Sequence, residues 1–152
     1  MKSILFFTSV HHGNTRKIAH AIAEQLGAEM FDMDERGVPR MDISSYDLVG
    51  LGSGVYRFGL SPKLFKLARS IDLKDKKVFL FSTSSSGQEK WHKRFKSVLA
   101  RKRALLLGEF VCLGFLDWAF FKKFDGGLNQ GHPDEADLTA ARAFADSLKK
   151  KV

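Results

Sequence analysis

Residues 3–27 read SILFFTSVHHGNTRKIAHAIAEQLG and predict a buried strand, a polar loop and an amphipathic helix in direct succession. The nearly continuous apolar run over residues 3–8 is typical of a parallel strand that is covered on both faces. Apolar residues then recur at helical spacing from residue 18 to residue 26, and Gly27 supplies the stop. The stretch therefore has the pattern of the opening unit of an α/β sheet.

The rest of the chain continues this alternation. Four further apolar stretches predict strands and three further amphipathic stretches predict helices, whereas residues 34–45 are polar and predict little regular helix. Because crossovers between parallel strands are right-handed, a doubly wound sheet is the simplest topology. We therefore expect one domain over residues 1–152, an α/β three-layer sandwich around a five-stranded doubly wound parallel sheet. The further strands are expected at 28–33, 48–53, 78–82 and 107–113, and the further helices at Pro62, near Trp91 and at Pro133–Glu135, with Asp134 as the cap.

The composition excludes several classes of protein. A chain of 152 residues with 44% hydrophobic and 28% charged residues has the composition of an ordinary soluble globule. Its one cysteine, Cys112, lies in an apolar run, which excludes a disulfide-stapled secreted fold and fits a reducing cytosol. No stretch approaches the roughly 18 apolar residues that a membrane span needs, and the run over residues 4–10 is too short for a signal peptide. We expect a cytoplasmic protein.

The net charge of +8 is concentrated in the second half of the chain. Residues 76–152 carry 15 basic and 8 acidic side chains, against 10 and 9 in residues 1–75. Such an excess serves solubility, or it attracts an acidic partner, a nucleic acid or a membrane surface. The basic helix near residue 91 lacks the interleaved exposed aromatic residues of a platform for single-stranded nucleic acid, so we expect no nucleic-acid partner.

The most informative residues follow the strands, because ligands of doubly wound sheets bind at the carboxyl ends of the strands. Residues 8–15 place hydroxyls, an amide and Gly13 at the start of a helix, where backbone N–H groups and the helix dipole favour an anion. The plainer interpretation is a capped turn in which Asn14 or Thr15 satisfies the helix. The loop lacks the lysine of a P-loop and the three glycines of a dinucleotide fingerprint. The chain also lacks a Gly-x-Ser-x-Gly elbow and the carboxylates of a phospho-acceptor receiver.

Two further loops share this edge of the predicted sheet. After the third strand, Tyr56 could lie flat against a planar ligand, or it could pack on the following helix. After the fourth strand, residues 83–87 offer a run of hydroxyl groups. One loop suited to an anion, one with a ring and one polar loop together describe a pocket for an aromatic ring system with a phosphate tail.

At these loops the sequence resembles the flavodoxin-like family, whose members bind FMN, and the resemblance covers nearly the whole chain. Residues 9–15 resemble the family's phosphate loop, usually Ser/Thr-x-Thr-Gly-x-Thr, but they are one residue longer and contain His11-His12. Residues 52–57 resemble the loop that covers one flavin face, and residues 81–87 resemble the loop on the other side. The resemblance implies the strand order 2-1-3-4-5 and FMN as the cofactor. The FMN contacts that it implies are Ser9, His11, His12, Gly13, Asn14, Thr15, Ser53, Gly54, Val55, Tyr56, Arg57, Thr83, Ser84, Ser85, Ser86 and Gly87.

Two departures from the family pattern bear on the chemistry. Arg57 stands where electron-transfer flavodoxins tend to have a glycine whose peptide flips, and arginine resists the positive φ that the flip needs. The third loop has serines where the family often has an aromatic residue, and the nearest ring, Trp91, follows one turn into a helix. We therefore expect one flavin face to be open. The basic chain also predicts a less negative potential for the second step of flavin reduction.

The resemblance implies an FMN-binding flavodoxin-like redox protein that carries electrons between partners and needs no catalytic side chain. An FMN-dependent oxidoreductase of the quinone reductase or protoporphyrinogen oxidase type, acting on an anionic or quinone substrate, stays open, as does a binding module that has lost its cofactor. We expect redox partner proteins with an acidic docking surface, no membrane span and no metal, because His11 and His12 lack a third ligand. His20 and His92 are expected on the surface, and Gly114–Gly131 is an unusually long connection.

Overall fold

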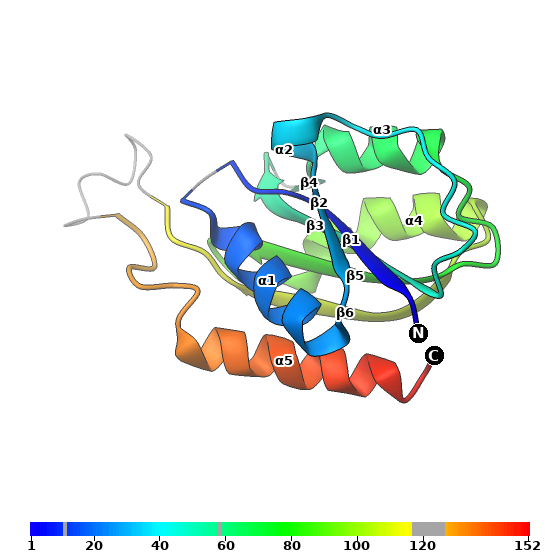
Figure 1. Ribbon diagram of the computed structural model, residues 1–152. Coiled ribbons are helices and arrows are strands. Elements are labelled where there is room, and N and C mark those ends of the chain that lie inside the picture. Colours follow the sequence, from blue (N-terminus) through cyan, green and yellow to red (C-terminus); the bar gives the residue numbers. More distant parts are fainter. Residues whose placement is uncertain (11, 58, 117–126) are drawn as a thin grey trace.

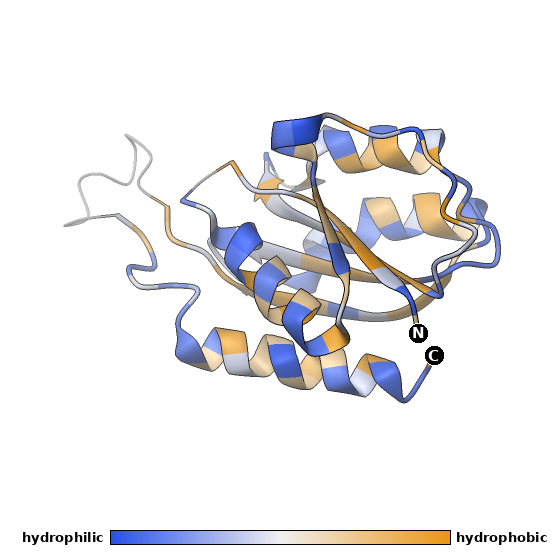
Figure 2. Cartoon of the chain, viewed as in Figure 1, coloured by the Kyte–Doolittle hydropathy of each residue, from blue (hydrophilic) through white to orange (hydrophobic). Residues whose placement is uncertain are grey.

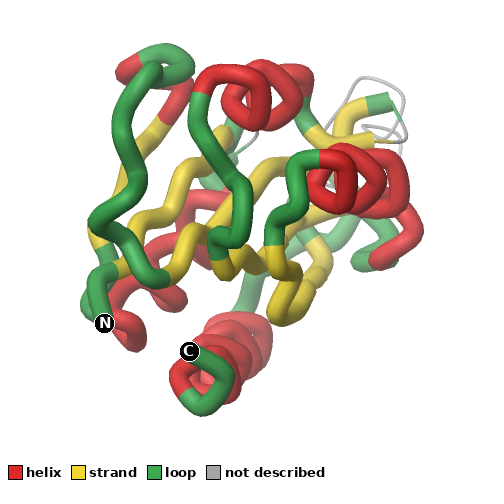
Figure 3. Tube along the Cα trace, turned by 90° about the vertical axis from the view of Figure 1, so that its right-hand side faces the viewer, coloured by secondary structure: helices red, strands yellow, loops and turns green. Residues whose placement is uncertain are grey.

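A central sheet with helices on both faces organises the chain (Figure 1; Figure 3). The computed structural model describes residues 1–10, 12–57, 59–116 and 127–152. The strands are β1 (Ser3–Thr8), β2 (Glu29–Asp32), β3 (Leu48–Tyr56), β4 (Gly59–Leu60), β5 (Lys77–Ser84) and β6 (Leu105–Leu113). The helices are α1 (Asn14–Leu26), α2 (Met33–Arg36), α3 (Pro62–Ser70), α4 (Lys93–Arg101) and α5 (Glu135–Lys149), and a short 3₁₀ helix, η1 (Glu89–His92), directly precedes α4.

The sheet has the strand order β2-β1-β3-β5-β6, and neighbours along this path are parallel. When these five strands are numbered along the chain the order is 2-1-3-4-5, so the predicted doubly wound α/β fold is confirmed. The sequence does not predict β4. The strand expected to end at Ser53 runs on to Tyr56, turns back and pairs antiparallel with β4.

Burial on both faces of the sheet explains why the strands are so apolar. All six residues of β1 are buried. Phe6 belongs to the hydrophobic cluster that includes α3 and α4, whereas Phe7 belongs to the cluster that includes α1 and α5. The helices cover the sheet in these two pairs, and each long helix carries hydrophobic and hydrophilic stripes (Figure 2). A strand between two such layers has no polar face, as the run over residues 3–8 predicts.

Three smaller expectations can be compared with the structure. Residues 34–45 contain little helix, because α2 covers only Met33–Arg36. Cys112 is buried, and burial raises the pKa of its thiol to about 12, so the side chain remains a protonated, apolar-like group. Within the ranges that the structure describes, no helix combines the length and the hydrophobicity that crossing a membrane requires.

Two glycines of β3 let aromatic rings lie directly against the strand. A Cβ atom built on Gly50 would come within 2.5 Å of Cζ of Phe79, and one built on Gly52 would overlap the ring of Phe81. Both rings are fully buried and cannot move aside into solvent. Packing therefore explains why the strand is rich in glycine.

We expect Gly52→Ala to destabilise the fold by about 1–3 kcal/mol, because close-packed cores tolerate added volume poorly and the new methyl group overlaps the Phe81 ring. Gly59→Ala is the matched control, since a Cβ atom at Gly59 meets no atom within 4 Å. Urea unfolding followed by circular dichroism measures both free energies. A Gly52→Ala protein as stable as the Gly59→Ala protein would contradict the packing argument.

Candidate functional site

The carboxyl ends of β1, β3 and β5 surround a cavity of about 330 Å³. Parallel pairing aligns these ends, because Thr8 pairs with Ser53 and Gly54 pairs with Thr83. The walls come from the three loops that the sequence singles out, from η1 and from the start of the connection after β6. The lining residues are Ser9, Val10, Asn14, Thr15, Gly54, Val55, Tyr56, Arg57, Thr83, Ser84, Ser85, Trp91, Gly114 and Leu116.

The first loop turns sharply from β1 into α1. His12 and Gly13 both have left-handed backbone conformations, with φ of 52° and 65°. Gly13 is the N-cap of α1 and makes no side-chain cap hydrogen bond, and the first turn of α1 contains no acidic residue. The imidazole of His12 lies against Phe115, with ring centroids 4.5 Å apart. The positive end of the α1 dipole therefore meets the first loop without a carboxylate in the helix to neutralise it, which favours an anionic ligand.

Asn14 and Thr15 open α1 with buried side chains that line the cavity. Thr15 Oγ1 lies 2.9 Å from Thr83 Oγ1, so a pair of hydroxyls ties the start of α1 to β5. The amide nitrogen of Asn14 donates to the carbonyl oxygen of Phe115 at 2.8 Å, but the amide oxygen, Oδ1, is buried without a hydrogen-bond partner. An unpaired buried acceptor costs about 1–3 kcal/mol. The atom is therefore suited to a hydrogen-bond donor that a ligand brings into the cavity.

Sequence reasoning missed the carboxylate that fixes the first loop. Asp34 of α2 accepts hydrogen bonds from Thr8 Oγ1 at 2.8 Å and from the backbone N–H of Ser9 at 2.6 Å, and Lys63 of α3 pairs with it at 2.5 Å. Partial burial opposes ionisation, but the hydrogen bonds from Lys63, Ser9 and Thr8 outweigh it and lower the pKa of Asp34. The ionised carboxylate joins three elements that are far apart in the sequence, so no local spacing could reveal it.

The second loop is the turn of the β3–β4 hairpin. Tyr56 pairs with Gly59, which makes Arg57 the first central residue of a two-residue turn. Such turns need a positive φ at this position, and Arg57 has a φ of 45°. The expectation that Arg57 resists a left-handed conformation is therefore wrong, because closing the hairpin imposes it. The Tyr56 hydroxyl accepts a hydrogen bond from the N–H of Val10 at 3.4 Å, so its side chain reaches across to the first loop.

The third loop brings an aromatic ring to the cavity. Ser84 Oγ accepts a hydrogen bond from the N–H of Gly87 at 2.8 Å, which closes the turn after β5. The chain then forms η1, whose Trp91 lies on the cavity wall and donates its indole N–H to Ser86 Oγ at 3.3 Å. Lys90 Nζ lies 4.6 Å from the centroid of the Trp91 ring. We expected this side of the pocket to have no ring, but the tight turn of η1 returns Trp91 to it.

Most of the predicted contact residues line the cavity, and some do not. Ser53 is fully buried below it and fixes the hairpin instead: its hydroxyl accepts from the N–H of Ser61 at 3.0 Å and donates to the carbonyl oxygen of Gly54 at 2.5 Å. Contact with a cofactor remains a prediction for every one of these residues. Four predicted contacts lie in the loops but not among the lining residues: His12, Gly13, Ser86 and Gly87. The predicted contact His11 lies outside the described residues, as do residues 117–126 of the long connection. Sequence reasoning did not assign four of the wall residues, which are Val10, Trp91, Gly114 and Leu116.

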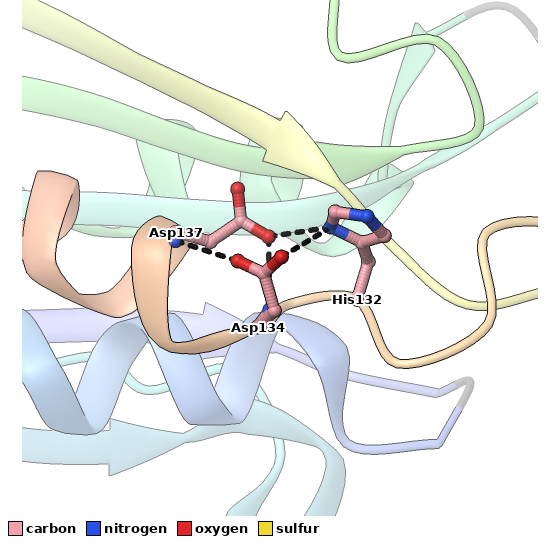
Figure 4. Close-up of side chains that lie close together, drawn as sticks. All are labelled: His132, Asp134 and Asp137. Atoms are coloured by element: carbon pink, nitrogen blue, oxygen red, sulfur yellow. Dashed lines mark hydrogen bonds and ion pairs between the residues drawn. The ribbon is translucent and has the colours of Figure 1, made fainter.

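A second cluster of chemically capable side chains lies at the start of α5 (Figure 4). His132 Nδ1 lies 2.7 Å from Asp137 Oδ2 and 3.8 Å from Asp134 Oδ2. The two carboxylates also accept hydrogen bonds from each other's backbone N–H groups at 2.9 Å, which forms a capping box and confirms Asp134 as the cap. These oxygens are thus occupied by the helix start, and we interpret the cluster as a support of α5.

These features define an open α/β domain whose ligand site lies at the turn between β1 and α1. A family model described as "Flavodoxin domain" matches residues 4–114, and the chain belongs to this family. It is 41% identical, over 153 residues and 99% of each chain, to the uncharacterized protein MJ0298 of Methanocaldococcus jannaschii. Its fold is shared by oxidised Flavodoxin 1 from Bacillus cereus, with a TM-score of 0.71, 20% identity and 99% coverage of both chains. A flavoprotein in complex with FMN from Lactobacillus acidophilus NCFM has a TM-score of 0.57 and 16% identity, over 72% of this chain and 92% of that one.

The His132 cluster predicts a pH-dependent stability. The hydrogen bond with Asp137 raises the pKa of His132 above its ordinary value of 6.5. The protonated imidazole therefore stabilises the fold fully below about pH 6.5, and this contribution is lost as the pH rises through the raised pKa. We expect the urea midpoint to fall between about pH 6 and pH 8.5 in the natural protein and to fall less in His132→Gln. His20→Gln, at an exposed position on α1, is the control, and equal slopes in all three proteins would refute this assignment.

Proposed function

We propose that the protein binds FMN in this cavity and acts as a redox protein that carries electrons between partners. The observation that carries the proposal is the unpaired Oδ1 of Asn14, which is buried on the cavity wall at the start of α1. A ligand that fills the cavity and donates a hydrogen bond to Oδ1 removes the cost of leaving this acceptor unpaired. The ribityl hydroxyls and the ring system of FMN supply both properties.

The remaining walls fit the two ends of FMN. The start of α1 and its dipole suit the phosphate, since backbone N–H groups at a helix start bind anions without a basic side chain. The hydroxyl of Ser9 already accepts a hydrogen bond from one of these groups, the N–H of Arg16, at 3.1 Å. Tyr56 and Trp91 reach the cavity from separate loops and offer aromatic surface to a planar ring. Family membership supports the same ligand. No metal is required by this arrangement.

In this proposal the bound cofactor supplies the electron transfer, and the chain supplies position and exclusion of water. The ionised Asp34 holds the first loop, the Thr15–Thr83 hydroxyl pair joins it to β5, and the Tyr56 hydroxyl joins it to β3. Burial raises the pKa of Tyr56, so its phenol remains neutral. Each of these contacts holds two loops in register before a ligand arrives, which lowers the entropic cost of binding.

The charge distribution supports an acidic partner. Arg57 is exposed at the tip of the hairpin while it also lines the cavity, and Lys90 lies over the ring of Trp91. The exposed side chains Lys93 and Arg94 follow directly at the start of α4 and add positive charge at this end of the helix. Opposite charge on a partner would steer it toward the cavity mouth at low ionic strength.

A second candidate function is an FMN-dependent oxidoreductase that acts on an anionic or quinone substrate. The observation that favours it is Arg57, whose cation stands at the cavity itself rather than only on the outer surface. A substrate anion could pair with this guanidinium beside the flavin. Turnover of a quinone at the expense of NAD(P)H by the FMN-loaded protein would establish the enzyme, whereas reduction without such turnover would support the carrier.

The assignment of FMN as the ligand predicts that a flavin without a phosphate group binds more weakly. We expect FMN to bind at least about tenfold more tightly than riboflavin, because only FMN places a phosphate at the start of α1. Fluorescence titration of the purified chain measures both dissociation constants. Equal affinities would show that the first loop holds no phosphate, and a chain that binds neither flavin would support a module without its cofactor.

Asn14→Leu tests the buried acceptor, although it also removes the amide donor that contacts the carbonyl oxygen of Phe115. We expect it to weaken FMN binding by about tenfold, since leucine has a similar size but cannot accept a hydrogen bond. Gln25→Leu is the matched control, because it removes an amide from the same helix at a position where the amide contacts Asp146 rather than the cavity. FMN binding by Asn14→Leu that matches Gln25→Leu would overturn the assignment of Asn14 as a ligand contact.

A further inference from the structure

His92 is a fully buried titratable residue directly behind the cavity wall. We expected it on the surface, but its exposed fraction is 0%, because η1 turns its last residue inward before α4 begins. His92 Nε2 lies 2.7 Å from the hydroxyl oxygen of Ser82 on β5. Its Nδ1 lies 3.4 Å from Oε2 of Glu109 on β6, which is near enough for electrostatic attraction, although neither atom has a hydrogen-bond partner. The imidazole thus stands between two strands and faces a polar group on each.

A chain of polar contacts continues from His92 to the surface. Oε1 of Glu109 pairs with Nζ of Lys96 at 2.8 Å, and the Lys96 side chain is partly exposed on α4. Burial lowers the pKa of His92, although Glu109 opposes this effect, so the imidazole is neutral at pH 7. Neutral imidazole has one donor and one acceptor nitrogen. A carboxylate facing Nδ1 favours a proton there, which leaves Nε2 to accept the hydrogen of the Ser82 hydroxyl.

Ser82 and His92 each adjoin residues of the cavity wall. Ser82 immediately precedes Thr83 and Ser84, which line the cavity from β5. His92 immediately follows Trp91, the aromatic wall residue of η1. Outside this contact, η1 packs against β4 and β6. A hydrogen bond between Ser82 and His92 therefore joins the polar wall to the aromatic wall from behind.

We propose that His92 is a positioning residue of the cavity: through Ser82 it holds η1 against β5 and so fixes the ring of Trp91 on the cavity wall. The expected effect on FMN binding rests on the proposed function. The effect on the position of Trp91 does not, because that position can be measured without ligand. A polar group buried solely for stability would be replaceable by any side chain that preserves packing. If His92 has a positioning role, a substitute must keep a polar atom at the place of Nε2, because that nitrogen contacts Ser82.

The same chain makes the position of Trp91 sensitive to protons. Ser82, Glu109 and Lys96 face the imidazole or its partner, and Glu89 of η1 adds a further charge nearby. Protonation gives His92 a second donor, so Nε2 can no longer accept from Ser82. The positive charge of the cation also strengthens the attraction between its Nδ1–H group and Oε2 of Glu109, while Lys96 faces Oε1 of the same carboxylate. This change is confined to pH values below about 6.5, because burial lowers the pKa of His92 from its ordinary value.

Two substitutions at position 92 separate the two nitrogens. The terminal amide of glutamine lies near the place of Nε2 and can still bond Ser82, whereas the shorter amide of asparagine lies near the place of Nδ1 and cannot. Ser82→Ala removes the same contact from the other side. His20→Gln, on the exposed surface of α1, is the matched control. All variants carry Trp118→Phe, so that Trp91 is the only indole of the chain.

The first measurement is the emission of Trp91 and its quenching by iodide in the absence of ligand, from about pH 5 to pH 8. We expect His92→Asn and Ser82→Ala to increase quenching by about twofold at neutral pH, and His92→Gln and His20→Gln to leave it unchanged. The parent protein should change below about pH 6.5 while His92→Gln stays flat. Circular dichroism confirms that each variant is folded, and His92→Gln together with Ser82→Ala decides the question if His92→Asn does not fold.

The second measurement is the dissociation constant of FMN. We expect Ser82→Ala and His92→Asn to weaken binding by about tenfold and His92→Gln to stay within about twofold of the parent. If the parent binds no FMN, the proposed function fails while the fluorescence still tests the positioning role. If FMN binds the parent and the variants do not differ from His20→Gln in quenching, pH profile or affinity, the positioning role of His92 is overturned.

Discussion

The hydrogen-bond register of β1, β3 and β5 is the constraint on which the rest of the structure depends. Parallel pairing places Thr8 beside Ser53 and Gly54 beside Thr83, so three strands end at one level. The loops that follow them are therefore neighbours, although they are separated by dozens of residues in the chain. A shift of one strand by a single residue would exchange the side chains that its two faces present to the two helix layers, and it would move the end of that strand out of level with its neighbours.

Polar contacts behind the cavity fix the loops that the strand register brings together. Asp34 holds the first loop through Thr8 and Ser9, and Ser53 holds the hairpin through the N–H of Ser61. On the other side, Ser82 meets the buried imidazole of His92. Each contact joins elements on different layers of the fold. Loops on a rigid sheet thus gain a fixed geometry without contributing to the hydrophobic core themselves.

The sequence was most informative where a local rule governs the structure. The apolar run over residues 3–8 predicts a strand buried on both faces, which is β1. Gly27 ends α1 in a left-handed conformation, and the short carboxylate of Asp134 caps α5. The expectations failed where partners distant in the sequence decide the outcome. Arg57 takes a positive φ because β4 pairs with β3, and His92 is buried because η1 returns its side chain toward β5 and β6.

The sequence by itself determined the alternation of strands and helices and the three loops at the carboxyl edge, because strand periodicity and loop chemistry are local properties of the chain. The strand order and most of the residues predicted to line the cavity came from the resemblance of those loops to the flavodoxin-like family. Tertiary structure alone decided that Trp91 faces the cavity, that Asp34 fixes the first loop and that Asn14 keeps an unpaired acceptor. Each of these depends on the distance between atoms of separate elements. Only the packing of the helices on the sheet sets those distances.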